Sequence, residues 1–330
     1  MHSKINNKKI AIVGNGSGGH FYPSKKVADE LEKNGAKIYY VVAKNRLDEN
    51  EIKKSNFKFI SLEYLGLKNN YLKFIKNQIK NYKIIRKFLK QNSIDFVIGF
   101  GGGLSFSLAL AAISLKIKTF IHEQNAILGR ANKILARKVK LLTAYKMDNY
   151  CFVGNPLVTK TKNKEVEYYD VIIVCGSQGS TSINELFIKY FEDNPVDYKV
   201  LFIVGKNDVK LQNKNITVKK YVEDLFYYFK KARLVITRGG ASTLAELSMT
   251  NCKLCIIPSP YVINNHQYFN ALEFQKDYGA EIIMEKELST QKISEIIDKN
   301  MNDFLKYNER IKVEKNNFLD LFIQEIENEI

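Results

Sequence analysis

Short apolar runs alternate with amphipathic segments along the whole chain. In the first half, runs rich in β-branched and aromatic residues predict strands at Lys9–Val13, Ile38–Val42, Phe57–Leu62, Phe96–Ile98, Thr119–Ile121 and Leu141–Ala144. In the second half they recur at Val171–Val174, Val200–Val204, Ile216–Val218, Leu234–Thr237, Leu254–Ile257 and Glu281–Met284, and helical sequence then continues to Ile330. Strands separated by helical segments predict βαβ units and parallel sheets.

The alternation is interrupted once, near the middle of the chain. Gly154-Asn155-Pro156 has turn chemistry, and a polar, charged stretch follows from Thr159 to Tyr169. A chain of 330 residues also exceeds what one hydrophobic core usually holds. We therefore expect an α/β fold of two Rossmann-like domains with a cleft between them. Residues 1–157 would form the first domain and residues 158–330 the second, with a final helix that can pack back on the first.

The segment Leu234–Leu247 predicts an anion-binding site. An apolar strand ends in Arg238-Gly239-Gly240, and a helix-forming run begins directly afterwards. Glycines let a phosphate approach the backbone, the first N–H groups of the helix attract it, and Arg238 offers a planar fork of donors. Glu246, in the first turns of the helix, can accept hydrogen bonds from a ribose diol, which indicates a nucleotide diphosphate. The structural alternative is that Thr243 and Glu246 form a capping box.

Three further glycine-rich turns follow predicted strands. Gly14–His20 matches the dinucleotide fingerprint, although the second strand ends at Val42-Ala43-Lys44-Asn45 without the acidic residue expected for a ribose. A basic strand end suits NADP, so an NADP-dependent oxidoreductase stays open as an alternative. The other turns are Gly99–Gly103 and Gly176–Ser180. At the carboxyl ends of strands, four such turns would converge on one crevice.

Charge is divided unevenly between the two halves of the chain. Residues 1–157 carry 28 Lys and Arg against 10 Asp and Glu, whereas residues 158–330 carry 23 against 25. The net charge of +16 therefore originates in the N-terminal half. A one-sided basic surface predicts an anionic partner, either nucleic acid or an acidic membrane face.

Other classes of protein are disfavoured by composition. No apolar run approaches the length of a membrane span, and residues 1–9 hold no signal-peptide stretch. The four cysteines lie mostly in apolar runs, which indicates reduced thiols in the cytoplasm. Cys252 and Cys255 have zinc-knuckle spacing, but no second Cys or His pair accompanies them, so we expect buried strand thiols and no metal site.

Taken in order, the motifs point to one family over nearly the whole chain. They are Gly16–His20 with Pro23, Gly101-Gly102, His122–Asn125, Gly154–Pro156, Gly176–Gly179, Arg238–Glu246, and His266-Gln267 with Asn270. This set resembles the MurG family, bacterial UDP-N-acetylglucosamine transferases that complete the disaccharide of the peptidoglycan lipid precursor. The resemblance implies the glycosyltransferase B architecture. Its N-terminal domain would bind the acceptor and face the membrane, and its C-terminal domain would bind UDP-N-acetylglucosamine.

The resemblance also implies site residues. The donor contacts fall on Ser17, Gly18, Gly19, Asn125, Ser177, Val222, Arg238, Ala241, Ser242, Thr243, Leu244, Ala245, Glu246 and Gln267. Val222 would meet the uracil through its backbone, the helix from Ala241 would hold diphosphate and ribose, and Gln267 would contact the sugar hydroxyls. Gly101, Gly102, His122 and Glu123 would lie on the acceptor side. The chain departs from the family at Val158, where an arginine is usual, and at Gly103, where an aromatic residue is frequent.

The implied reaction is an inverting transfer. The 4-hydroxyl of an undecaprenyl-diphosphate-linked N-acetylmuramoyl pentapeptide attacks the anomeric carbon of UDP-N-acetylglucosamine, and UDP leaves. His20 is our candidate general base, because imidazole titrates near neutrality, and its alternative role is to order the first loop. No Asp-x-Asp motif follows a strand, so we expect neither a metal nor another cofactor. Another glycosyltransferase of the same architecture, acting on a lipid such as diacylglycerol, is the closest alternative.

The segment Tyr64–Ile94 predicts an amphipathic basic helix. It contains no Asp or Glu, and its cations are Lys68, Lys73, Lys76, Lys80, Lys83, Arg86, Lys87 and Lys90. Apolar residues recur among them at mostly three- or four-residue steps, at Leu72, Ile75, Ile79, Tyr82 and Leu89. The lipid-linked acceptor of the family favours docking of this helix on an anionic lipid surface, at the cytoplasmic face of the membrane, over a nucleic-acid partner. The alternative is that the apolar stripe packs on its own sheet and the lysines are only solvated.

Overall fold

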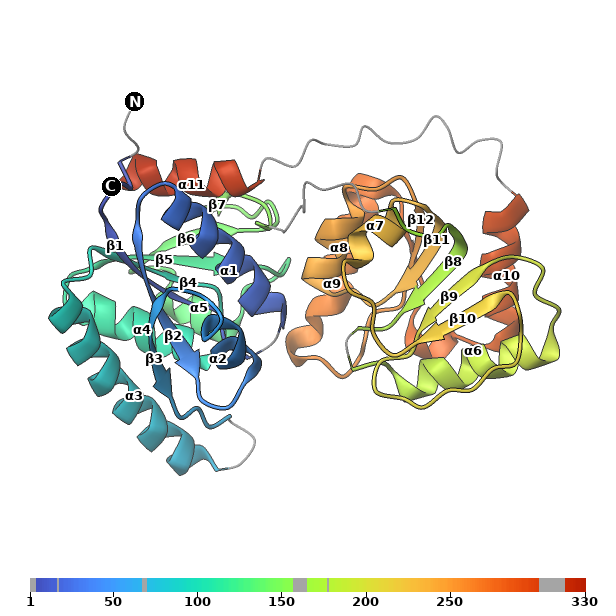
Figure 1. Cartoon of the computed structure of the whole chain (residues 1–330), viewed down its shortest axis with the longest axis horizontal. Coiled ribbons are helices and arrows are strands. Elements are labelled where there is room, and N and C mark those ends of the chain that lie inside the picture. Colours follow the sequence, from blue (N-terminus) through green and yellow to red (C-terminus); the bar gives the residue numbers. More distant parts are fainter. Residues whose placement is uncertain (1–3, 17, 67–69, 157–164, 177, 303–317) are drawn as a thin grey trace. The chain divides into compact units, whose positions relative to one another are not determined.

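A computed structural model of the protein describes residues 4–16, 18–66, 70–156, 165–176, 178–302 and 318–330. The chain divides into two compact units (Figure 1). The N-terminal unit comprises Met1–Thr159 together with Asn317–Ile330, and the C-terminal unit comprises Lys160–Asn316. Both units are α/β structures built on a parallel sheet.

The N-terminal unit contains a seven-stranded parallel sheet in the order β3-β2-β1-β4-β5-β6-β7. Its strands are β1 (Lys9–Val13), β2 (Lys37–Ala43), β3 (Lys58–Leu62), β4 (Phe96–Gly99), β5 (Lys118–Glu123), β6 (Lys140–Thr143) and β7 (Cys151–Phe152). Its helices are α1 (Gly18–Lys33), α2 (Leu47–Ile52), α3 (Tyr71–Asn92), α4 (Gly103–Ser114), α5 (Arg130–Leu135) and α11 (Phe318–Glu329). Six of the strands were predicted. β7, two residues long, was not.

The final helix, α11, belongs to the N-terminal unit. It lies beside α1 (Figure 1), and Phe322 stacks on Phe100 with ring centroids 5.5 Å apart. Lys140 forms ion pairs with Glu325 at 2.8 Å and with Glu329 at 3.0 Å. Residues of the last helix therefore pack in the same hydrophobic core as residues of the first strand.

Helix α3 is basic, as predicted, and its apolar stripe is only partly buried. The residues it buries are Asn77, Asn81, Ile85 and Leu89, whereas Leu72 and Ile79 are 69% and 51% exposed. The asparagines are buried because their side chains bond to the backbone of residues 63 and 65. Part of the expected apolar stripe consequently lies on the surface among the lysines.

The C-terminal unit contains a six-stranded parallel sheet in the order β10-β9-β8-β11-β12-β13. Its strands are β8 (Tyr169–Val174), β9 (Val200–Ile203), β10 (Ile216–Lys219), β11 (Ala232–Thr237), β12 (Lys253–Ile256) and β13 (Glu281–Ile282). Its helices are α6 (Thr181–Asp193), α7 (Leu225–Phe229), α8 (Ala241–Leu247), α9 (His266–Tyr278) and α10 (Thr290–Asn302), with 3-10 turns η1 (Ile263–Asn265) and η2 (Glu285–Glu287). All six strands were predicted.

The strand order of each sheet reverses at one point, between β1 and β4 in the first and between β8 and β11 in the second. In open parallel sheets, ligands bind outside the carboxyl ends of the strands at such a reversal. The four glycine turns follow these four strands, so each unit carries two of them at its own reversal point. Within the described segments, no helix is long and apolar enough to cross a lipid bilayer.

Candidate active site

In the N-terminal unit, the two glycine turns pack directly against each other. Gly101 and Gly102 have positive φ angles of 96° and 83°. A Cβ atom on Gly102 would lie 2.2 Å from the backbone oxygen of Asn15, and the Leu104 amide donates to Asn15 Oδ1 at 3.2 Å. Only glycine satisfies both the backbone conformation and this close approach.

His20 lies on α1 against the second turn. A Cβ on Gly101 would be 2.8 Å from Cε1 of the His20 ring, so the bare glycine makes room for the imidazole. Nδ1 of His20 is 2.5 Å from Oε1 of Gln124, while Nε2 of Gln124 donates to the backbone oxygen of Phe100 at 2.9 Å. Because the second bond fixes the carboxamide, its oxygen accepts from Nδ1–H of His20. The lone pair of the neutral ring is then on Nε2, the nitrogen suited to take a proton.

Gln124 was not among the predicted site residues, although it belongs to the His-Glu-Gln-Asn run. Its position at the end of β5, one residue beyond the strand, was the available signal. Its role follows only from the fold, because His20 is 104 residues away in the sequence.

The side chain of His122, which is predicted to lie on the acceptor side, is buried in the core. This side chain is 1% exposed, packs against the rings of Phe100 and Phe322 with centroids 5.5 and 5.6 Å away, and bonds through Nε2 to the Gly154 carbonyl at 2.9 Å. Burial lowers the pKa of His122 to about 4, so the ring is neutral near pH 7. We assign it a structural role.

Glu123 is also buried, at 4% exposure, and it organises the loop that carries Asn125. One carboxylate oxygen accepts from the Asn125 amide and side chain, both at 3.1 Å, and the other accepts from the Gly129 amide at 2.9 Å and from Asn132 at 2.8 Å. Since its oxygens accept hydrogen bonds from this loop, Glu123 orients Asn125. Asn125 itself is half-buried.

In the C-terminal unit, α8 begins directly after the Gly239-Gly240 turn. Its N-cap is Gly240, with no side-chain cap, so Thr243 and Glu246 occupy the third and sixth helical positions and do not form a capping box. The Ser242 hydroxyl is buried and has no hydrogen-bond partner. Ala241, Thr243 and Ala245 are half-buried, and Leu244 is buried. The first turn of α8 therefore presents unpaired donors.

Glu246 has an unusual environment for a carboxyl group. Desolvation by burial, with a smaller contribution from the charge of Asp224, raises the pKa of Glu246 to about 7. Within the described part of the chain, its carboxyl group has no hydrogen-bond or ion-pair partner. A desolvated, unpaired carboxyl is poised to accept hydrogen bonds from a ligand.

The Arg238 guanidinium, which the sequence predicts to bind a phosphate, makes its contacts inside the C-terminal unit. The residue is 8% exposed, forms a 2.7 Å ion pair with Glu285, and donates to the Ser180 hydroxyl at 2.8 Å and to the Ile257 carbonyl at 3.1 Å. Glu285 in turn accepts from the Ser182 hydroxyl at 2.7 Å. This network joins the end of β11 to the loop after β8 and to η2.

The start of α9 packs against the turn that precedes α8. Asn270 donates to the Gly239 carbonyl at 3.0 Å, and a Cβ on Gly239 would lie 2.2 Å from the backbone oxygen of Gln267. The side-chain oxygen of Gln267 accepts from the Ser259 amide at 2.9 Å. Val222 is 7% exposed, and its backbone groups bond to no other described residue. Gly239, Gln267 and Asn270 thus form one cluster at this edge of the sheet.

The remaining predicted residues are placed as follows. Gly18 and Gly19 begin α1 at the first glycine turn. Ser17, Ser177 and Val158 lie outside the described residues.

Comparison with known proteins identifies the family. Residues 10–143 match the glycosyltransferase family 28 N-terminal domain, and residues 170–326 match the glycosyltransferase family 28 C-terminal domain. The chain is 33% identical to a UDP-N-acetylglucosamine–N-acetylmuramyl-(pentapeptide) pyrophosphoryl-undecaprenol N-acetylglucosamine transferase of Thermosipho africanus, with 98% of this chain and 99% of that protein covered. It is 31% identical to a Listeria monocytogenes protein of the same name, with 91% and 92% covered. The chain belongs to the MurG family of glycosyltransferases.

Solved structures agree with this assignment of the fold. The crystal structure of Acinetobacter baumannii MurG is 23% identical, with a TM-score of 0.78, and covers 97% of this chain and 99% of that one. The kitacinnamycin glycosyltransferase is 14% identical, with a TM-score of 0.77 and 98% and 99% covered. The predicted two-domain α/β glycosyltransferase B fold is confirmed. Membership of the MurG family makes the chain a glycosyltransferase and favours glycosyl transfer over the NADP-dependent oxidoreductase.

Proposed function

We propose that the protein transfers N-acetylglucosamine, with inversion, from UDP-N-acetylglucosamine to the 4-hydroxyl of undecaprenyl-diphosphate-linked N-acetylmuramoyl pentapeptide, a step of peptidoglycan precursor synthesis. The name shared by its full-length relatives supports both substrates. The structural observation that carries the proposal is the unpaired, desolvated carboxyl of Glu246 on α8, a helix whose first turn is uncapped. The carboxyl of Glu246 can bind a ribose diol, and the uncapped first turn of α8 can bind a diphosphate.

The C-terminal unit supplies the donor site in this proposal. The amides from Ala241 onward, with the Ser242 and Thr243 hydroxyls, bind the diphosphate, while Leu244 and Ala245 carry the helix behind them. Glu246 binds the ribose, and the backbone of Val222 meets the uracil edge. Gln267, held at the Gly239 turn, contacts the sugar hydroxyls. Arg238 acts indirectly, because its ion pair with Glu285 fixes the loop that carries Ser180. Ser177, Ser17, Gly18, Gly19 and Asn125 stay in the proposed donor set on the strength of the family resemblance.

The N-terminal unit supplies the base. Nδ1–H of His20 donates to Gln124, so the lone pair of the neutral ring is on Nε2. Nε2 takes the proton of the acceptor 4-hydroxyl as the hydroxyl oxygen attacks. The glycosyl–phosphate bond breaks at the same time, and the helix amides of the donor site stabilise the charge that develops on UDP. Gly101 and Gly102 lie on the acceptor side in this proposal, where they give space to the His20 ring and to Asn15.

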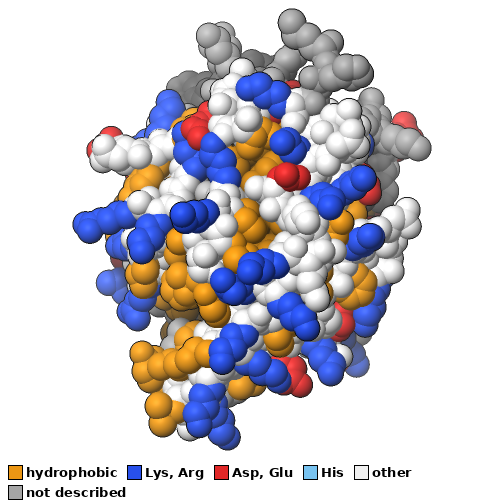
Figure 2. Space-filling model, turned by 90° about the vertical axis from the view of Figure 1, so that its left-hand side faces the viewer, with side chains coloured by type: hydrophobic (Ala, Val, Ile, Leu, Met, Phe, Trp, Pro, Cys, Tyr) orange, Lys and Arg blue, Asp and Glu red, His pale blue; other side chains and the backbone are white. Residues whose placement is uncertain are grey.

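The outer face of the N-terminal unit has the character of a membrane-binding surface. On α3, Tyr71 and Leu72 are 65% and 69% exposed among exposed lysines. Figure 2 shows this side of the molecule with many Lys and Arg side chains, hydrophobic side chains between them and few acidic ones. We place this face on anionic lipid at the cytoplasmic surface, which brings the site to a lipid-linked acceptor.

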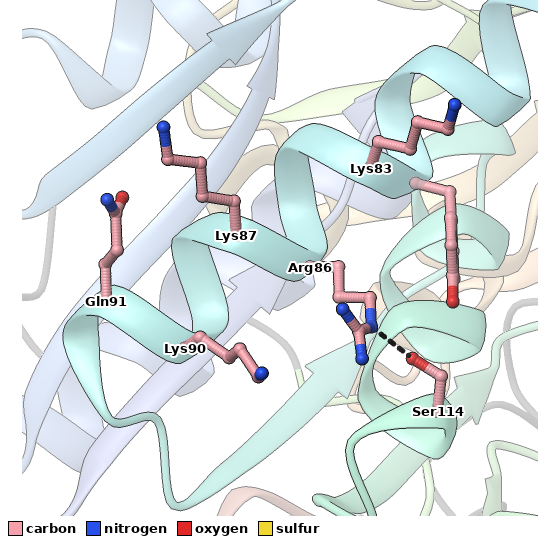
Figure 3. A pocket seen from close by; sticks show the side chains of 7 residues that line it. Lys83, Arg86, Lys87, Lys90, Gln91 and Ser114 are labelled. Atoms are coloured by element: carbon pink, nitrogen blue, oxygen red, sulfur yellow. Dashed lines mark hydrogen bonds between the residues drawn. The ribbon is translucent and has the colours of Figure 1, made fainter.

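A groove of about 530 Å³ beside α3 adds to this surface. It is lined by Tyr82, Lys83, Arg86, Lys87, Lys90, Gln91 and Ser114 (Figure 3). Arg86 donates to the Ser114 hydroxyl of α4 at 3.2 Å, so its guanidinium is held beside the lysines. Four cations without an acidic partner in the lining suit lipid phosphates.

A transfer assay tests the proposal. Radiolabelled UDP-N-acetylglucosamine is offered with a short-chain lipid-linked N-acetylmuramoyl pentapeptide or with diacylglycerol, and labelled lipid product is measured. We expect product with the first acceptor only. Product with diacylglycerol alone would assign the protein to the alternative acceptor class, and product with neither would refute glycosyl transfer to lipid.

A further inference from the structure

Three consecutive glycines at the start of α4 each give space to a different side chain. The ring of His20 lies against Gly101, and Asn15 lies against Gly102. A Cβ on Gly103 would lie 2.3 Å from Cε2 and 2.4 Å from the hydroxyl oxygen of Tyr64. The Tyr64 ring therefore fills the volume that a side chain at position 103 would occupy. Position 103 is two residues after Gly101, against which the proposed base His20 lies.

The residues on either side of Tyr64 in the sequence are hydrogen-bonded to α3. Asn77 and Asn81 donate to the Glu63 carbonyl at 3.0 and 2.9 Å, and the Leu65 amide donates to Asn77 Oδ1 at 3.1 Å. Both asparagines are at least nine-tenths buried. Two buried polar side chains that bond to this segment explain why α3 has polar residues at core positions, and they hold Tyr64 in place.

Arg46 stacks on the outer side of this ring. Its guanidinium carbon is 5.3 Å from the Tyr64 centroid, and the residue is exposed. Arg46 follows β2 and Tyr64 follows β3, whose ends pair at Ala43 and Leu62, so both stand at the carboxyl edge of the sheet. Among the described residues, the guanidinium has no hydrogen-bond or ion-pair partner. A guanidinium stacked on an aromatic ring keeps its planar fork of donors oriented for an oxyanion.

We infer that Arg46 and Tyr64 determine acceptor recognition in the proposed reaction. Arg46 donates to an oxyanion of the acceptor, and Tyr64 positions the guanidinium over the glycine turn. The oxyanion belongs either to the diphosphate or to a carboxylate of the peptide, since both offer oxygens in a plane to the same fork. This inference rests on the proposed function but concerns residues outside the donor site and outside the base.

Steady-state kinetics with a detergent-solubilised acceptor test the inference. Arg46→Gln is expected to raise the acceptor KM about tenfold to hundredfold, as for loss of a charge-assisted hydrogen bond, with the donor KM and Tm near those of the parent. Arg137→Gln, at an exposed arginine of the same unit, is the matched control and leaves both constants unchanged. An unchanged acceptor KM in Arg46→Gln overturns the inference, as does an equal rise of both KM values.

Tyr64 is tested by moving its ring. Tyr64→Phe should keep the acceptor KM, Tyr64→Ala should raise it, and Gly103→Tyr in the Tyr64→Ala background should restore it from the neighbouring position. If the acceptor KM rises in Tyr64→Ala and Gly103→Tyr does not lower it again, the ring does not act at the glycine turn, which contradicts the inference. An acceptor without the peptide distinguishes the two candidate oxyanions. If Arg46 binds the diphosphate, Arg46→Gln still raises the KM for this acceptor; if Arg46 binds a peptide carboxylate, the KM difference from the parent disappears. If the parent itself transfers nothing, the proposed function fails, whereas an active parent with unaffected variants refutes only the roles of Arg46 and Tyr64.

Discussion

The carboxamide of Gln124 joins His20 to the backbone just after β4: its oxygen accepts from His20 Nδ1 at 2.5 Å and its nitrogen donates to the Phe100 carbonyl at 2.9 Å. A backbone carbonyl thus fixes the tautomer of a side chain on another element. The same carboxamide holds the imidazole beside the glycine turn, where the proposed reaction requires a proton acceptor.

His20→Ala should lower kcat by about 10²–10⁴, as for loss of a general base, while donor binding is largely retained. His20→Gln keeps hydrogen bonding without the basic nitrogen and should be as slow as the alanine variant. Turnover of the glutamine variant close to that of the parent would leave His20 only the role of ordering the first loop. Titration of UDP binding, measured in parallel, verifies that the donor site is intact.

Glu246→Gln should weaken donor binding and, at the same time, raise the stability of the fold. Loss of a charge-assisted acceptor corresponds to about 1.5–3 kcal/mol, or roughly tenfold to hundredfold in donor KM. Burial holds the pKa of Glu246 near 7, above the ordinary 4.5 of a glutamate. The unfolded chain therefore binds fewer protons in this window, and the contribution of Glu246 to stability, present below pH 4.5, is lost as the pH rises through 7. The variant should thus have the higher Tm at pH 8, and the difference should shrink towards pH 5.

The pH dependence of donor binding provides a second test of Glu246. In the parent, the donor KM should rise as the pH falls below 7, because the carboxyl group becomes protonated and can accept less well. Glu246→Gln should lack this rise. Asp277→Asn, at an exposed carboxylate of the same unit, is the matched control and should keep the parent profile. Equal donor KM values for parent and Glu246→Gln at pH 8 would remove Glu246 from the donor site.

Arg238 and Glu285 should behave as a coupled buried pair. Arg238→Ala leaves the carboxylate of Glu285 buried without its cation and should destabilise the protein by about 3–5 kcal/mol, and the double variant with Glu285→Ala should lose less than the sum of the single changes. The exposed Lys220–Asp208 pair, at 3.1 Å, is the control, for which Asp208→Ala should cost only about 0–1 kcal/mol. Urea unfolding of the four variants measures the coupling, and strictly additive losses would show that the pair does not act as a unit.

Regular elements could be predicted from the sequence because their apolar runs are local. Strand β7 was missed because a run of two residues, Cys151 and Phe152, has no periodicity to detect. The burial of Asn77 and Asn81 on α3 was not predicted, because these residues are polar and the reason for their burial is a backbone segment twelve to eighteen residues earlier. Hydrophobic periodicity carries no information about such a partner.

The glycine turns and Glu246 could be located from sequence because turn chemistry is also local. The burial of His122 and the occupation of Arg238 could not, since they depend on Gly154 and Glu285, which lie 32 and 47 residues away. Tyr64 is a further case, because its relation to Gly103 arises only when the carboxyl ends of β3 and β4 are brought to one edge. Residue type predicted which chemistry was available, and the fold determined which groups were left unpaired.

The basic face of α3 is exposed and has few acidic neighbours among the described residues. Lys76, Lys80, Lys83 and Lys87 are exposed, and only Lys80 has an acidic neighbour, Glu63 at 3.8 Å, within the described residues. Each well-placed cation near an anionic surface contributes about 1 kcal/mol, and salt screens the attraction. Changing all four lysines to Glu should therefore abolish most sedimentation with anionic vesicles, while turnover on a detergent-solubilised acceptor stays close to that of the parent.

A charge-matched control distinguishes this face from net charge alone. Four exposed lysines of the C-terminal unit, Lys189, Lys206, Lys210 and Lys214, are changed to Glu in a second variant. Because this variant has the same net charge but an intact α3, it should still bind anionic vesicles, with binding that falls as salt is added. Equal loss in both variants would assign the attraction to overall charge, and equal binding of the α3 variant and the parent would exclude α3 as the docking surface. Leu72→Ser with Ile79→Ser, which removes exposed apolar area and no charge, should weaken binding at high salt more than at low salt, since the apolar contribution is not screened.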